Sequence, residues 1–120
     1  MFYLGQYDLK INDNIIEFPF EMDKDEVEYC EVKTEDGYTY LIVDYIKEVK
    51  ELDCYKEGKK GIMKIQDDHS ILPSELSHYS HIPLVCIGAG DVIEIWEKNQ
   101  FNDYCDKQRA LFESLKEISF

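Results

Sequence analysis

The stretch that most limits how this chain can fold is residues 82–97, where a nearly unbroken apolar run leads through Gly-Ala-Gly-Asp into an alternating run. In the second run Ile93 and Ile95 share one face and the residues between them share the other, which is typical of a half-buried strand. The glycines at 88 and 90 permit the positive φ angle of a tight reversal. We therefore predict a β-hairpin with a fully buried first strand, and nothing in it suggests catalysis.

The same signals predict more hairpins and three helices. Strands are expected at residues 2–11 and 15–18, at 27–33 and 38–43, and at 62–65 with a short return at 70–73. Helices are expected over 45–52 with Asp44 as cap, over a short segment from an N-cap at Ser74 to Tyr79, and over 99–118. The last helix is amphipathic, with an apolar stripe interrupted only by Gln108.

The two halves of the chain are similar at a spacing of 54 positions. Pro19 and Pro73 have this spacing, as do the polar turns that follow Ile11 and Ile65. Either half is too small to bury its own apolar faces. We therefore predict a single domain over residues 1–120, in which repeat 1 (about 1–54) and repeat 2 (about 61–120) share one core and residues 55–61 connect them.

The charge of the chain is strongly one-sided, with 26 acidic residues against 13 Lys and Arg and a net charge of −13. Proteins that neutralise phosphates need clustered bases, so this balance argues against nucleic acid and against an anionic membrane surface. The N-terminal ten residues alternate and carry Asp8, and no 18-residue apolar stretch occurs. We expect neither a signal peptide nor a membrane span, and therefore a cytoplasmic protein.

Residue types that carry chemistry do not form a convincing site. Cys30, Cys54, Cys86 and Cys105 have neither zinc nor disulfide spacing, and we interpret them as reduced core residues. The run from Asp67 to His69 has two carboxylates and an imidazole, yet adjacent turn residues point in different directions, which favours a solvated turn over a metal site. No catalytic residue, metal or cofactor is expected.

Two segments of the second half resemble the MraZ family, which belongs to the AbrB-like swapped-hairpin superfamily. They are Pro73 to Tyr79 and Pro83 to Lys98, with a helix starting near Phe101, and the opening Met1 to Tyr7 is also similar to the family. The resemblance implies an α+β, mainly β fold: a swapped-hairpin, double-psi-related barrel of two intrachain repeats with a C-terminal amphipathic helix. It also implies a bacterial transcription regulator that assembles into rings.

In the MraZ family DNA contact is attributed to a polar turn in each half that carries Gly and Arg. The matching turns here, Asn12-Asp13-Asn14 and Gln66-Asp67-Asp68-His69, hold neither residue. Arginine grips phosphate or guanine with two parallel hydrogen bonds, which a mostly neutral His cannot do. Direct DNA binding is therefore not expected. If DNA is bound, the candidate contacts are Lys10, Asn12, Asn14, Lys64, Gln66 and His69.

We predict a non-catalytic regulatory protein that acts through association with itself, with a related family member or with another protein. Tyr38, Tyr40 and Tyr45 are the candidate interface residues, since aromatic side chains are common at interfaces. One alternative is a DNA-binding repressor of the MraZ type. Another is an acidic inhibitor that resembles an antitoxin or mimics DNA.

Overall fold

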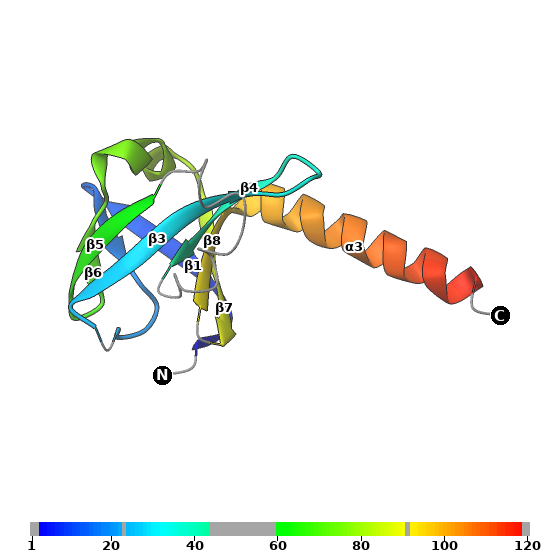
Figure 1. The fold of residues 1–120 in the computed structure, drawn as a ribbon, viewed down its shortest axis with the longest axis horizontal. Helices are drawn as coiled ribbons and strands as arrows, with labels where there is room; N and C mark the ends of the chain where they lie inside the picture. Colours follow the sequence, from blue (N-terminus) through cyan, green and yellow to red (C-terminus); the bar gives the residue numbers. More distant parts are fainter. Residues whose placement is uncertain (1–2, 23, 44–59, 91, 119–120) are drawn as a thin grey trace.

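The computed structural model describes residues 3–22, 24–43, 60–90 and 92–118 (Figure 1). These residues form eight strands, one 3-10 helix and one α-helix. The strands are β1 (Tyr3–Asn12), β2 (Ile15–Glu17), β3 (Glu26–Lys33), β4 (Thr39–Val43), β5 (Lys60–Gln66), β6 (His69–Ile71), β7 (Leu84–Gly90) and β8 (Val92–Glu97). The helices are η1 (Ser74–His81) and α3 (Lys98–Ile118).

The strands close into one antiparallel barrel in the order β1-β2-β6-β5-β3-β4-β8-β7. Pairs of strands from the two halves of the chain alternate in this order. The halves meet where β1 pairs with β7, β5 with β3, β2 with β6 and β4 with β8. The predicted mainly β fold with a C-terminal helix is therefore confirmed. Neither half forms a sheet that is closed without the other.

Tight turns join the paired strands. Asp13 and Asn14 lie between β1 and β2 with φ angles of 50° and 63°, and Asp67 lies between β5 and β6 with φ 60°. Asp and Asn tolerate this left-handed region better than most residues. At the end of β7, Gly90 has a positive φ, of 82°. The prediction for Gly88 was wrong, because β7 continues through it and pairs it with Ile93.

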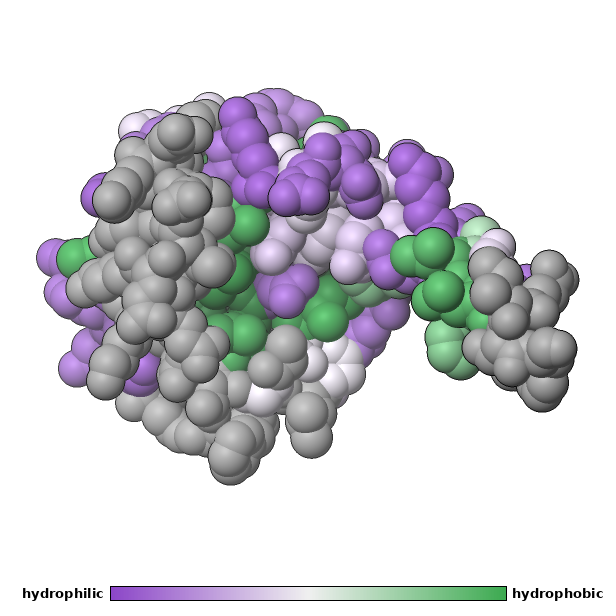
Figure 2. Space-filling model, turned by 45° about the vertical axis from the view of Figure 1, so that its right-hand side comes forward, coloured by the Kyte–Doolittle hydropathy of each residue, from purple (hydrophilic) through white to green (hydrophobic). Residues whose placement is uncertain are grey.

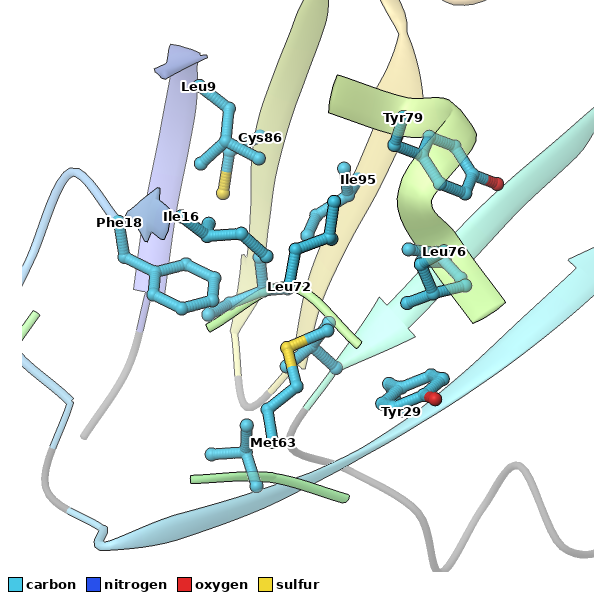
Figure 3. Close-up of a cluster of buried hydrophobic side chains, with 14 of the residues drawn as sticks. Leu9, Ile16, Phe18, Tyr29, Met63, Leu72, Leu76, Tyr79, Cys86 and Ile95 are labelled. Atoms are coloured by element: carbon cyan, nitrogen blue, oxygen red, sulfur yellow. The ribbon is translucent and has the colours of Figure 1, made fainter. Parts of the chain in front are cut away.

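The core fills the inside of the barrel. Met63, Leu72 and Ile95 are buried there, in a cluster that also includes Tyr29 (Figure 3). Inward-facing residues of the other seven strands supply most of this cluster, and β6 contributes none, because neighbouring strand side chains point to opposite faces of the sheet. Ile95 and Ile93 face the interior as the sequence predicts.

The helix η1 covers one end of the barrel with two buried side chains, Leu76 and Tyr79. The prediction of Ser74 as N-cap was wrong. The capping position is Pro73, which makes no side-chain capping hydrogen bond, and Ser74 is already inside the helix. The residues before Pro73 are extended in β6, so the chain reaches the proline in the extended conformation that favours a helix start immediately after it.

The helix α3 begins on the barrel and then extends away from it (Figure 1), which gives the molecule dimensions of 53 × 28 × 28 Å. Its first turns pack on a second cluster outside the barrel, where Trp96 contacts Phe101 and Tyr104. The predicted helix is confirmed to within one residue at its start. Its distal apolar residues Leu111, Phe112 and Leu115 are 55–62% exposed.

Several predictions lie partly or wholly outside the described residues: the helix 45–52 with its cap Asp44, residues 55–59 of the connector, Cys54 and Tyr45. The end of the predicted connector, residues 60–61, is the start of β5. Cys30 and Cys86 are buried as predicted, whereas Cys105 on α3 is only half-buried. Among the described helices none combines the length and the apolar character that crossing a membrane requires.

Candidate functional site

The turns that the sequence singles out lie at the two ends of the short β2–β6 pair. Their backbones are tied to the neighbouring strand, since Leu72 N donates to Asn14 O at 2.7 Å and Phe18 N donates to Asp68 O at 2.8 Å. Within the pair Ile15 lies opposite Ile71. We call the outward side of β2 and β6, together with the two turns, the β2–β6 face.

All six predicted nucleic-acid contacts have exposed side chains on this part of the molecule, but they do not form one group. Lys64, Gln66 and His69 line a pocket of about 550 Å³ on the β2–β6 face. Lys10, Asn12 and Asn14 belong to the other hairpin and do not line it. The barrel therefore divides the candidates into two sets of three.

The charges beside these residues are mostly negative. His69 Nε2 lies 3.4 Å from Glu17 Oε1, and its Nδ1 contacts Asp68 Oδ1. Asp13 and Asp67 occupy the two turns themselves. Like charges repel, so a phosphate that approached either turn would first meet an aspartate.

The centre of the β2–β6 face is apolar, which the sequence did not reveal. Ile15 and Ile71 lie opposite each other with 41% and 76% of their surfaces exposed. In the next pair of the register, Ser70 is 4% exposed and faces the interior opposite Ile16. From polarity alone, Ile71 would be expected to face inward and Ser70 outward. The observed orientations are the reverse, because the short turn before β6 sets the register of this strand.

Cys86, Tyr38 and Tyr40 are engaged in internal packing. Burial raises the pKa of Cys86 to about 12, which opposes the thiolate needed for nucleophilic chemistry. Tyr40 stacks on Trp96 with ring centroids 4.5 Å apart, and Tyr38 is buried beside the same ring. Their predicted role at an interface stays a prediction.

Metal binding has no support in the part of the chain that the structure describes, where no group of three His, Cys, Asp or Glu side chains is placed to hold an ion. No protein-family model matches this chain, and no curated protein sequence matches it. The surface described above is a polar and acidic rim around two exposed isoleucines. Such a composition is suited to contact with another protein more than to contact with a polyanion.

Proposed function

We propose that this chain is a non-catalytic, MraZ-like regulatory domain that acts by associating with further copies of itself or with another protein. The observation that carries the proposal is the combination of two exposed apolar surfaces with a net charge of −13. One surface is the β2–β6 face, centred on Ile15 and Ile71. The other is the distal part of α3, where Figure 2 shows hydrophobic atoms on the segment that extends from the barrel.

The strand pairing supports a swapped-hairpin barrel of two repeats. The equivalent strands of the two halves are β1 and β5, β2 and β6, β3 and β7, and β4 and β8. When each strand is replaced by its equivalent, every pair of neighbours in the barrel becomes another pair of neighbours. Equivalent strands meet twice, and there Ile16 lies opposite Ser70 and Leu41 lies opposite Ile95. Both pairs have the spacing of 54 that relates the two halves of the sequence. Each hairpin also lies against a strand of the other half, as exchanged hairpins do.

The distal surface of α3 favours association with a second copy. Leu111, Phe112 and Leu115 recur at the spacing of one helical face, and the barrel does not extend along this part of the helix (Figure 1). On the flanks, Lys107 pairs with Asp103 and Arg109 with Asp106. An apolar stripe between paired charges is the pattern by which two helices pack side by side.

Light scattering across a range of protein concentrations tests this association. The unchanged chain should form oligomers, and Leu111→Lys should shift the distribution toward monomer because a charge in the stripe cannot be desolvated without cost. Ala110→Lys is the matched control, since it adds the same charge about 100° around the helix, away from the stripe. A chain that is monomeric at every concentration contradicts self-association, and capture of a partner protein through the same surface is then the remaining form of the proposal.

A DNA-binding repressor is the second candidate, favoured by the exposure of the six polar residues at the two turns. Fluorescence anisotropy with promoter-length duplex DNA at low salt distinguishes the two functions. Because the turns carry aspartates, we expect binding weaker than about 1 µM, with little dependence on sequence. Tighter, sequence-selective binding that Lys10→Glu and Lys64→Glu abolish would establish the repressor instead.

A further inference from the structure

A second pocket, of about 420 Å³, lies at the end of the barrel that η1 covers. Its walls come from the end of β3, the start of β4, the helix η1, and the junction of β8 with α3. Mouths of barrels are common positions for ligand sites. This pocket is separate from the β2–β6 face, with which it shares no lining residue.

Glu31 is the feature of this pocket that needs an explanation. Its side chain lines the pocket although the residue is only 8% exposed. Tyr79 donates its hydroxyl to Glu31 Oε2 at 3.5 Å, a long hydrogen bond, and within the described chain the other carboxylate oxygen accepts none. Burying a carboxylate costs free energy that is recovered only when hydrogen bonds or a cation compensate it.

A second carboxylate lines the same pocket. Glu97 Oε2 accepts a hydrogen bond from Gln100 Nε2 at 2.9 Å, which fixes its position at the start of α3. Burial first, and then the charges of Glu31 and Glu97, raise the pKa of Tyr79. The interior of the pocket therefore has a negative potential that favours a positively charged group.

The two basic residues of the pocket are at its rim. Lys33 and His78 are exposed, and Lys33 makes no ion pair with Glu31 or Glu97 in the described structure. Lys33 lies two residues after Glu31 on β3, so both side chains leave the strand on the same side. The rim cation therefore lies outside the acidic interior without neutralising it.

We propose that this pocket binds a primary ammonium group, with Glu31 and Glu97 as the anionic acceptors. An ammonium group has three donors, and the pocket offers three acceptors that suit them: the free oxygen of Glu31, Glu97, and the Tyr79 hydroxyl oxygen. The Tyr79 ring, against which His78 lies with centroids 4.2 Å apart, adds an aromatic wall that favours a cation. The ammonium group belongs either to a small free amine or to a lysine side chain of another protein, and the inference is independent of association through α3.

Isothermal titration calorimetry on the full chain tests the proposal with two probes. 1,4-Diaminobutane represents a free amine, and Nα-acetyl-lysine amide represents a lysine side chain in a protein. Binding of the diamine supports the first source, and binding of the lysine derivative alone supports the second. 1,4-Butanediol has the same length without charge and should not bind. Absence of binding by both amines up to about 10 mM overturns the proposal.

Variants locate the binding. Glu31→Gln should weaken it at least about tenfold, because the amide presents an N–H donor to the cation and carries no charge. Glu28→Gln is the matched control: it removes one carboxylate from the same strand on the outward face, and binding should be unchanged. Equal binding by the Glu31→Gln and Glu28→Gln variants overturns the proposal. Glu97→Gln provides an independent test if the Glu31 variant does not fold.

Lys33→Met gives a further test of the sign of the electrostatic potential inside the pocket. Removing the rim cation should leave amine binding equal or tighter, because the nearest competing positive charge is gone. Weaker binding by this variant would mean that Lys33 helps to hold the amine, which its positive charge opposes, and that outcome overturns the assignment.

Discussion

The phenol hydroxyl of Tyr38 donates a hydrogen bond to Asp103 Oδ2, which joins the loop before β4 to the second turn of α3. Lys107 lies over the same ring, with Nζ 5.0 Å from its centroid. Beneath these contacts, Trp96 supplies the apolar surface on which the helix begins. The direction in which α3 leaves the barrel is thus set by a polar contact above an aromatic cluster.

The Tyr38 contact predicts a pH dependence of stability. The hydrogen bond to Asp103 raises the pKa of Tyr38 above that of an unfolded tyrosine, about 10. The stabilisation is therefore complete below pH 10 and is lost as the pH rises through the folded-state pKa. Tyr38→Phe should lower the urea midpoint at pH 7, and its difference from the parent chain should shrink at pH 11. An equal difference at both pH values would exclude the hydrogen bond as its source.

Trp96 should be the main residue that holds α3 on the barrel. It is 2% exposed, and its ring stacks on Tyr40 and meets Phe101 at a centroid distance of 5.4 Å. Trp96→Ala should reduce the free energy of unfolding by about 3–5 kcal/mol, from lost burial and the cavity that remains. Leu111→Ala, at a 56% exposed position on α3, should change the free energy of unfolding by less than about 0.5 kcal/mol under monomeric conditions. Urea unfolding followed by circular dichroism measures both.

Gly61 should tolerate no side chain, because β5 passes close to a buried ring there. A Cβ atom at this position would lie 2.6 Å from the Tyr29 hydroxyl oxygen and 2.9 Å from the ring carbon that bears it. Tyr29 is 1% exposed and has little room to move. Gly61→Ala should cost about 1–3 kcal/mol of unfolding free energy. Tyr29→Phe removes the hydroxyl that makes the closest clash. In that background, Gly61→Ala should therefore cost less unfolding free energy than in the parent chain. If the two substitutions have fully additive effects on the unfolding free energy, this contact is not the cause.

Cys30 and Cys86, which are buried, should resist alkylation in the folded protein. Burial raises the pKa of Cys86 to about 12, so the contribution of its protonated thiol to stability is present below the unfolded thiol pKa and is lost as the pH rises toward 12. At pH 8, iodoacetamide followed by mass spectrometry should modify the half-buried Cys105 before Cys30 and Cys86. Modification of all three at similar rates would indicate global unfolding or a more open barrel.

Local signals predicted the secondary structure well. Asp13 and Asn14 marked the first turn, Asp36-Gly37 the turn before β4, and the stripe through Phe101 and Leu115 the last helix, because each depends on residues close in sequence. The predictions for Gly88 and Ser74 failed because these positions depend on more than the residues next to them in sequence. The strand partner of Gly88, and the extended approach to Pro73, are imposed from outside the local sequence.

The candidate sites were predicted less completely. The six polar residues at the turns are exposed as a DNA-reading surface would require, but the pairing of Ile15 with Ile71 and the inward position of Ser70 depend on strand register. A shift of one residue reverses which side chains face the solvent, and the sequence of β6 alone does not set it. The pocket around Glu31 was missed altogether, since its walls come from residues 31–39, 78–82 and 97–100, which are far apart in the chain.

The sequence alone determined the mainly β composition of the fold, its turns, the C-terminal helix and a 54-residue spacing between similar halves, because these depend on short-range periodicity and on residue counts. The tertiary structure decided which strands of the two halves become neighbours, which isoleucines reach the solvent and where a buried glutamate faces a pocket. These features arise from pairings between distant segments, and the free energy that selects them comes from closing one barrel around a shared core.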